Sequence, residues 1–440
     1  MKNRYHLVHS IENKPFHDFE ENAIVYVDSV FCANQRVNND YFNNFDTISF
    51  IQPFASDVSA ECVDYLQKKI GKNFSFQQIQ KKPITKNLYN YDKFDEFDFF
   101  MDSFDIGDFN AFNALTIPIV IYYRAKQILK NRYIVESECE QHCATHDADI
   151  LIYHDLDVLI LDNILDSVKT LFNNNYDNQN NHDAFIYVSY FELCNDDLIL
   201  DDRTNFQKIY NYLNELSFHF IHNPQIQTDK ISTSSDSSVT IKEIIKLKKQ
   251  LHKLIRDFQE FCEYPHNSNL TELPYANTYL VITKLSQNSQ IDDADEISIL
   301  YEWLELSQII YRIGKTIDSL ENMESMYYVY NNTDNALNAV AGNIIAEVSE
   351  EMAMAILILK YPSRIKKLPP DLLLPVKPVK NDNIESRMLH YETFDNLFDI
   401  IKNPKSNTSI RSNCIFKNVY HRLRKKGKFS IDMMKDVFMK

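Results

Sequence analysis

Glycine is the residue that this sequence most clearly lacks. Average usage of roughly 7% would give about 30 glycines in a chain of this length, and the 440 residues include only 5. Loops that bind phosphate need glycine, because the backbone must approach the phosphate closely without a Cβ in the way. Neither GxGxxG nor GxxxxGK[ST] occurs, so an activity that depends on a glycine-rich phosphate loop is nearly excluded.

Long apolar runs and paired cysteine motifs are also missing. The longest apolar stretches, around residues 114–123 and 352–359, are much shorter than the roughly 20 residues of a membrane-spanning helix. The cysteines number 7, an odd count, and no CxxC occurs, which is typical of reduced thiols rather than of a disulfide framework. The first residues lack the apolar core of a signal peptide. We therefore expect an intracellular protein with no membrane partner.

The charge balance argues against a broad nucleic-acid interface. The 46 Lys and Arg residues against 62 Asp and Glu residues give a formal net charge of −16, and an acidic surface repels the phosphate backbone. One dense basic cluster, near the C-terminus, could contact nucleic acid locally or act as a nuclear-localisation signal; it could equally be a solvated helix end. Its cations are Arg422, Arg424, Lys425, Lys426 and Lys428.

The pattern of apolar residues predicts an α+β fold, with a mixed α/β domain over residues 1–202 and a helical domain over residues 203–360. An extended Pro-rich segment with C-terminal helices follows over residues 361–440. Short runs of β-branched and aromatic residues indicate strands, and apolar residues at helical spacing indicate helices. Strands are expected at residues 23–31, 47–54, 148–153 and 184–191, and helices at residues 59–70, 115–131, 163–172, 240–263, 292–320 and 333–361.

The stretch most suggestive of chemistry is residues 135–163, VESECEQHCATHDADILIYHDLDVLILDN. Two Asp-x-Asp pairs, Asp147 with Asp149 and Asp155 with Asp157, flank one apolar strand. Alternate residues of a strand point to the same face, so each pair can converge on one cation. Carboxylates are the ligands that Mg²⁺ and similar hard cations prefer. The pattern therefore indicates a metal site at one end of this strand.

The first pair resembles the nucleotidyltransferases of the polymerase-β and poly(A)-polymerase type, which carry a Gly-Ser turn, a helix and then Asp-x-Asp on a strand. Here Val135-Glu136-Ser137 precedes Asp147-Ala148-Asp149-Ile150. The resemblance implies that Asp147 and Asp149 hold Mg²⁺ and that Ser137 contacts the nucleotide, with Glu192 or Asp183 as third carboxylate. The family's glycine is Glu136 here, and a carboxylate at that position repels a triphosphate, so we expect a scaffold that has lost its activity.

The second pair supports other interpretations. Cys143-Ala144-Thr145 followed by Asp155-Leu156-Asp157 fits the same nucleotidyltransferase pattern in another register. Asp155-Leu156-Asp157 is also similar to the Asp-x-Asp motif of GT-A glycosyltransferases, which follows a strand and binds a nucleotide sugar through Mn²⁺. It is similar to the opening motif of haloacid-dehalogenase phosphatases as well, although Leu159 replaces the expected Thr or Val. Aspartates also simply terminate strands.

The overall composition, rich in Asn, Asp, Ile, Phe and Tyr, is similar in style to that of large DNA viruses, and the size and acidity are similar to baculovirus nucleocapsid and assembly proteins. That similarity implies a virion structural protein that assembles with other capsid proteins, in the virion and in the host nucleus or cytoplasm. Its contact elements would be the acid-aromatic segment at residues 91–112 and the Pro-rich segment at residues 368–380. Such a protein needs no cofactor, whereas the enzyme alternatives need Mg²⁺ or Mn²⁺.

Overall fold

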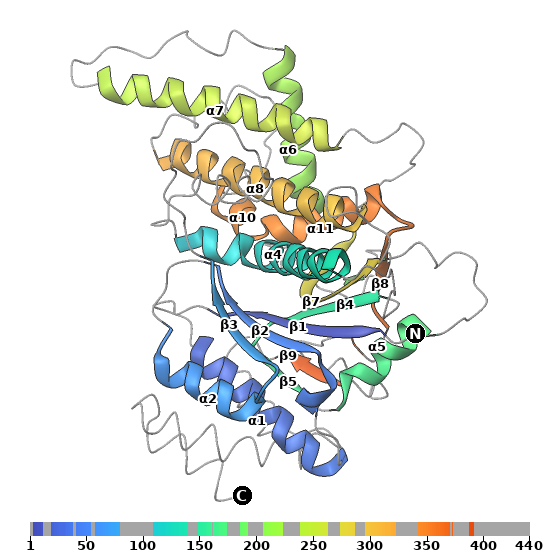
Figure 1. Ribbon diagram of the computed structural model, residues 1–440. Helices are drawn as coiled ribbons and strands as arrows, with labels where there is room; N and C mark the ends of the chain where they lie inside the picture. Colours follow the sequence, from blue (N-terminus) through green and yellow to red (C-terminus); the bar gives the residue numbers. More distant parts are fainter. Residues whose placement is uncertain are drawn as a thin grey trace, which may run out of the picture.

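The central element of the fold is one mixed sheet, seen edge-on in the middle of Figure 1. The computed structural model describes residues 3–11, 19–37, 41–53, 58–79, 109–138, 148–160, 162–173, 185–191, 206–222, 238–262, 273–286, 295–322, 342–369, 372 and 387–390. Within these residues the sheet has seven strands in the order β3-β2-β1-β4-β7-β6-β8. They are β1 (Arg4–Ser10), β2 (Thr47–Gln52), β3 (Phe74–Gln78), β4 (Ala148–His154), β6 (Ile186–Phe191), β7 (Tyr275–Ser286) and β8 (Ile365–Lys367).

Strand directions divide this sheet into two parts. β1, β2, β3 and β4 are parallel to one another, whereas β7 is antiparallel to both β4 and β6. β6 and β8 are parallel to each other. The sheet takes strands from all three of the regions expected from the sequence, because β7 belongs to residues 203–360 and β8 to residues 361–440. The expected mixture of sheet and helix is confirmed, with a central strand inside the region expected to be mostly helical.

Helices cover both faces of the sheet (Figure 1). Three helices pack on one face: α1 (Phe19–Val37), α2 (Ala60–Ile70) and α5 (Ile164–Asn173). The opposite face is covered by α4 (Phe109–Glu138), α8 (Asp295–Asn322), α10 (Gly342–Glu347) and α11 (Ser349–Lys360), with α6 (Phe206–His222) and α7 (Ser238–Cys262) outside them. The sheet is therefore buried between two helical layers, each with its own apolar core.

Among the described residues, no helix is both long enough and apolar enough to cross a membrane.

The predicted strand at residues 23–31 is wrong, because these residues lie in α1. Ala23, Tyr26, Val27 and Val30 are all buried against the sheet. Their spacing of i, i+3, i+4 and i+7 is that of one helix face. The β-branched and aromatic composition indicated a strand, but the periodicity was helical, and burial of one face decides between the two.

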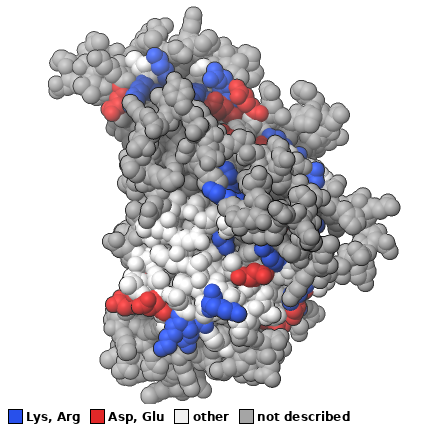
Figure 2. Space-filling model, in the orientation of Figure 1, with Lys and Arg blue, Asp and Glu red and all other residues white. Residues whose placement is uncertain are grey.

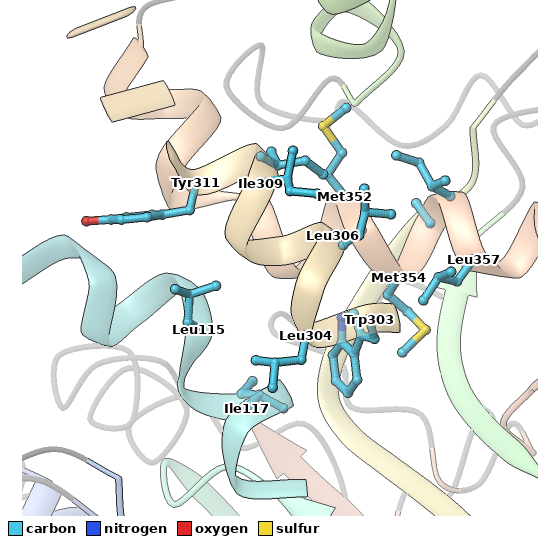
Figure 3. Close-up of a cluster of buried hydrophobic side chains, with 14 of the residues drawn as sticks. Leu115, Ile117, Trp303, Leu304, Leu306, Ile309, Tyr311, Met352, Met354 and Leu357 are labelled. Atoms are coloured by element: carbon cyan, nitrogen blue, oxygen red, sulfur yellow. The ribbon is translucent and has the colours of Figure 1, made fainter. Parts of the chain in front are cut away.

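The helical layer of α4, α8 and α11 is held together by the apolar cluster in Figure 3, which includes Ile117, Trp303 and Met354. Trp303, the one tryptophan of the chain, is fully buried and donates a hydrogen bond from Nε1 to the carbonyl oxygen of Glu350 at 2.9 Å. This bond joins α8 to the first turn of α11. It therefore fixes the position of the acidic residue Glu350 relative to the sheet.

A second, smaller sheet lies beside α1. β5 (Val158–Ile160) pairs antiparallel with β9 (Met388–His390). The backbone N–H of Ile160 donates to the Ser29 hydroxyl of α1 at 3.0 Å. The segment that follows β4 is therefore anchored to a helix on one side and to a distant part of the chain on the other.

Candidate functional site

The strand order reverses between β1 and β4. β1 pairs with β2 on one side and with β4 on the other, all three parallel. Ligands of open α/β sheets bind outside the carboxyl ends of strands at such a switch point. The carboxyl ends here are Ser10 of β1 and His154 of β4, and Asp155-Leu156-Asp157 follows His154 directly. The fold thus places the second Asp-x-Asp pair where a ligand is expected.

Backbone hydrogen bonds fix the turn that carries this pair. The N–H of Asp155 donates to the carbonyl oxygen of Tyr279 in β7 at 3.0 Å, which extends the β4–β7 ladder by one residue. β5 begins at Val158 and pairs with β9, where His390 is the register partner of Val158. The turn is therefore tied to a strand at each end, while both of its carboxylate residues stay partly exposed.

A line of hydroxyl groups supports the first carboxylate of the turn. The Tyr153 hydroxyl donates to Oδ1 of Asp155 at 2.6 Å, and Ser10 Oγ lies 3.3 Å from the same Tyr153 oxygen. Burial, together with the nearby Asp155 charge, raises the pKa of Tyr153 well above its usual value. Tyr153 therefore keeps its proton and remains a hydrogen-bond donor to Asp155.

Glu350 adds a buried acid to the same edge of the sheet. Its Oε1 accepts a hydrogen bond from Thr278 Oγ1 of β7 at 3.3 Å. Burial, and then the charges of Glu351 and Asp155, raise the pKa of Glu350 well above the ordinary glutamate value. The surroundings therefore favour the protonated form of Glu350, close to the Asp-x-Asp turn.

Two histidines lie on the other face of the sheet, directly under the turn. His9 of β1 and His154 of β4 are fully buried, with ring centroids 4.3 Å apart. Nδ1 of His9 lies 3.0 Å from the carbonyl oxygen of His154, and Nδ1 of His154 lies 2.7 Å from that of Asp155. Burial lowers the pKa of His9 well below its usual value and lowers the pKa of His154 to about 4. Both rings are therefore neutral near pH 7.

The other end of the same strands holds Asp149 of the first pair. This carboxylate is fully buried. Arg4 donates from Nε to its Oδ1 at 2.7 Å and from Nη2 to its Oδ2 at 3.0 Å. His6 Nε2 lies 2.9 Å from Oδ1, and Arg132 of α4 also bonds to Oδ2. Both oxygens are engaged by protein donors, which favours a structural role.

The electrostatics of Asp149 agree with these contacts. Burial alone would raise its pKa, but hydrogen bonds from His6, Arg4 and Arg132 outweigh burial and hold the pKa well below its usual range. Arg124 reinforces the positive surroundings: its Nη2 donates to Thr47 Oγ1 at 2.7 Å. Asp149 is thus a permanently ionised group at the centre of a network that links β1, β4 and α4.

The remaining predicted site residues are placed only in part. Ser137 lies in the last turn of α4, and Asp147, Asp183 and Glu192 lie outside the described residues. So do the five cations of the basic cluster, most of the acid-aromatic segment at residues 91–112, and most of the Pro-rich segment at residues 368–380. Their assigned roles, the virion partners and the proposed locations stay predictions.

Glu350, Thr278, Ser10 and His9 are residues of this edge that the sequence did not reveal. None belongs to a recognisable motif, and they come together only through the order of the strands. A polar residue at the end of an apolar strand, such as Ser10, was the one available signal. His154, which immediately precedes the Asp-x-Asp pair, could have been included on the same ground.

Asp155 and Asp157 have the chemistry of a divalent-cation site. Among the described residues, no group of three or more His, Cys, Asp or Glu residues could hold a metal ion. Mg²⁺ and similar ions at nucleotide sites are usually bound by one or two carboxylates together with substrate phosphates and water. Two carboxylates on one turn therefore fit a cation that arrives with a phosphorylated ligand, rather than a resident metal in a protein cage.

The surface charges do not add a nucleic-acid interface to this picture. On the face shown in Figure 2, the Lys and Arg side chains of the described residues are interspersed with Asp and Glu side chains. A protein that binds nucleic acid through its backbone needs a basic field of one sign. This face, as far as the structure describes it, does not present one.

Comparison with known proteins gives little at the level of sequence. No family model matches the chain, and no curated protein matches it. One similar solved structure is core-mannan synthase A (CmsA/Ktr4) from Aspergillus fumigatus in its Mn/GDP form, with 8% identity and a TM-score of 0.29, covering 83% of this chain and 72% of that one. Another is mouse xyloside xylosyltransferase 1 in its apo form, with 11% identity and a TM-score of 0.33, covering 89% and 98%.

Proposed function

We propose that this protein is a metal-dependent glycosyltransferase that binds a nucleotide sugar at the carboxyl ends of β1 and β4. Asp155 and Asp157 would hold Mn²⁺ or Mg²⁺ against the diphosphate of the donor. The observation that carries the proposal is the position of this Asp-x-Asp pair, which follows β4 at the switch point of the sheet. Ligands of open α/β sheets, nucleotides among them, bind at such a switch point. The sequence Asp155-Leu156-Asp157 also resembles the Asp-x-Asp motif of GT-A glycosyltransferases, which likewise follows a strand.

The alternative of nucleotidyl transfer is less well supported. In the register that uses the first Asp-x-Asp pair, it requires the carboxylate of Asp149 to face a metal and a triphosphate. That carboxylate is fully buried and bonded by Arg4, His6 and Arg132. Removing two guanidinium partners to bind a metal would leave buried charges uncompensated, at a cost of several kcal/mol.

In the proposed reaction, the bond between the anomeric carbon of the sugar and the diphosphate breaks. A bond from that carbon to an acceptor hydroxyl oxygen forms, the nucleoside diphosphate leaves with the electrons of the broken bond, and the hydroxyl proton passes to solvent water. When bound, the cation would neutralise the charge on the departing diphosphate. The chain's own residues do the positioning: the Tyr153 hydroxyl orients the Asp155 carboxylate by hydrogen bonding, and Glu350 lies near that carboxylate.

Release of nucleoside diphosphate tests this proposal. Purified protein would be incubated with UDP-sugars and GDP-sugars in Mn²⁺, Mg²⁺ or EDTA, because such enzymes hydrolyse their donor slowly when water replaces the acceptor. We expect release with at least one donor, dependent on the cation and abolished in the Asp155→Asn/Asp157→Asn double variant.

Asp162→Asn is the matched control, since Asp162 is a nearby, partly exposed carboxylate whose partner is Arg387, at 3.3 Å. It makes the same chemical change outside the turn and should leave release unchanged. Release that persists in the double variant, or that is absent with every donor and cation, would contradict the proposal.

A further inference from the structure

We propose that His9 and His154 form a positioning pair that orients the Asp155–Asp157 turn for metal binding, through hydrogen bonds to the backbone of the turn. This inference rests on the proposed function, because it assigns a role to residues beneath the proposed metal site. Neither ring belongs to the Asp-x-Asp motif, and each ring forms a hydrogen bond with a backbone carbonyl oxygen of residue 154 or 155. The two histidines would therefore act through the backbone, as positioning residues.

The two hydrogen bonds form a continuous series. Nδ1 of His9 bonds to the carbonyl oxygen of His154 at 3.0 Å, and Nδ1 of His154 bonds to the carbonyl oxygen of Asp155 at 2.7 Å. A carbonyl oxygen can only accept, so each Nδ1 must carry the proton. The side chain of His9 in β1 is therefore bonded to the backbone of His154, the last residue of β4. The side chain of His154 is bonded to the backbone of Asp155.

Their surroundings show that these histidines are not ordinary core residues. Both rings are fully buried in an aromatic cluster in which Tyr26 lies 4.8 Å from each ring centroid and Phe50 lies 4.8 Å from that of His9. The Nε2 atoms of His9 and His154 are buried and make no hydrogen bond with any residue that the structure describes. Buried polar atoms without partners are costly. An aliphatic or phenyl side chain would avoid that cost, but it would lose the Nδ1 donor.

The bonded carbonyls lie where the backbone leaves the regular sheet. They belong to consecutive residues, His154 and Asp155, and the orientation of these two peptide planes sets the direction in which the following carboxylates project. Sites that bind metal need their ligands held to within about half an ångström of the working geometry. Outer-shell partners of metal ligands typically change metal affinity by 10-fold to 100-fold when they are removed.

Another histidine on the same strand provides a matched control. His6 is also buried on β1, but its ring bonds to Thr47 and Asp149 at the amino end of the sheet. Replacing His6 removes a buried imidazole of the same size from the same strand. It should lower the stability of the fold without changing the Asp155–Asp157 turn.

The experiment measures Mn²⁺ affinity in the presence of UDP or GDP, using the paramagnetic resonance signal of free Mn²⁺, on full-length variants. His9→Leu removes the donor, and we expect Mn²⁺ to bind at least 10-fold more weakly. In His9→Asn the amide nitrogen is as many bonds from Cα as Nδ1, so this variant should restore most of the affinity. In His9→Gln the nitrogen is one bond farther away, so it should not. His6→Leu should lower the midpoint of thermal unfolding and leave the Mn²⁺ affinity unchanged.

The outcomes separate this inference from the proposed function. Wild-type affinity in His9→Leu, or an equal loss in His9→Asn and His9→Gln, overturns the positioning role and leaves the proposed metal site standing. No Mn²⁺ binding by the wild-type protein with either nucleotide overturns the proposed metal site and the positioning role with it. If His9→Leu does not fold, the comparison of His9→Asn with His9→Gln gives the same decision.

Discussion

The two ends of the β1–β4 pair use carboxylates in opposite ways. Asp149 and Asp155 are six residues apart on the chain, about 20 Å along an extended strand. At the amino end, Asp149 is buried among Arg4, His6 and Arg132, which lower its pKa. At the carboxyl end, Asp155 lies near a second acid, Glu350, whose pKa is raised in part by that proximity. An acid matched by cations stabilises a fold, whereas the partly exposed carboxylates of Asp155 and Asp157 are suited to bind a cation from outside.

The sharpest way to break this comparison is to remove one aspartate from each end. Asp149→Ala leaves the buried Arg132 and the partly buried Arg4 without their carboxylate. Loss of one partner from a buried ion pair typically costs about 3–5 kcal/mol. We therefore expect the free energy of unfolding to fall by about that amount. Asp155→Ala removes one hydrogen bond from Tyr153 and should cost about 1 kcal/mol. Urea unfolding of both variants measures the difference. A similar loss of unfolding free energy in the two variants would contradict the proposed difference between the two ends of the β1–β4 pair.

The histidines give the carboxyl end a distinct pH dependence. The pKa of His154 is lowered to about 4, against about 6.5 for an unfolded histidine. Between these values the unfolded chain binds a proton that the native protein does not, so the free energy of unfolding falls as the pH falls, by up to about 3 kcal/mol. Subtracting the wild-type profile from that of His154→Asn, measured by urea unfolding from pH 7 to pH 4, should show this contribution. Parallel profiles would exclude it.

A site remote from both ends separates stability from binding. A Cβ on Gly314 of α8 would lie 2.5 Å from the carbonyl oxygen of Gly342 and 2.6 Å from the backbone nitrogen of Ala346. Backbone atoms cannot move aside easily, so Gly314→Ala should lower the free energy of unfolding by about 1–3 kcal/mol. Thermal unfolding would register the loss, and Mn²⁺ affinity below the unfolding transition should stay at the wild-type value. Weaker Mn²⁺ binding in this variant would mean that the affinity reports general stability.

A further prediction concerns the pH dependence that Glu350 gives to stability, which has the opposite sign to that of His154. Its raised pKa means that the native protein keeps a proton which the unfolded chain releases above about pH 4.5, so the free energy of unfolding falls as the pH rises from there to the raised pKa. Glu350→Gln, a neutral residue of the same shape, should gain about 1 kcal/mol relative to the wild-type protein for each pH unit in that window. Urea unfolding at pH 5, 6 and 7 measures this gain. A constant difference would show that Glu350 is ionised in the folded protein.

The sequence predicted several helices and the strands β2, β4 and β6, but it missed β1, β3 and β7 of the same sheet and the helices α1 and α6. The helix expected at residues 59–70 is α2, and the structure adds that Ser59 caps it, since the Ser59 side chain accepts a hydrogen bond from the Cys62 N–H. The strand at residues 148–153 is β4, which begins and ends within one residue of the prediction. β7 was missed, although it is rich in β-branched and aromatic residues, because its place between β4 and β6 depends on residues more than eighty positions away in the chain.

The candidate site was predicted to a similar extent. Two Asp-x-Asp pairs could be read from the sequence, but nothing local distinguished them. The partners of Asp149 come from β1 and α4, and the acid near Asp155 comes from α11. That Asp149 is enclosed by cations, and that the second pair lies at the switch point of the sheet, follows from the tertiary structure. The two Asp-x-Asp pairs are alike in sequence, and their different surroundings exist only in the folded protein.

The most direct test of the account is Mn²⁺ binding in the presence of UDP or GDP, compared between wild-type protein and the Asp155→Asn/Asp157→Asn double variant at a temperature where both are folded. The account predicts saturable binding of one Mn²⁺ by the wild-type protein and its loss in the double variant. Equal binding by both proteins, or none by the wild-type protein, would contradict the claim that the carboxyl end of the β1–β4 pair is the functional end.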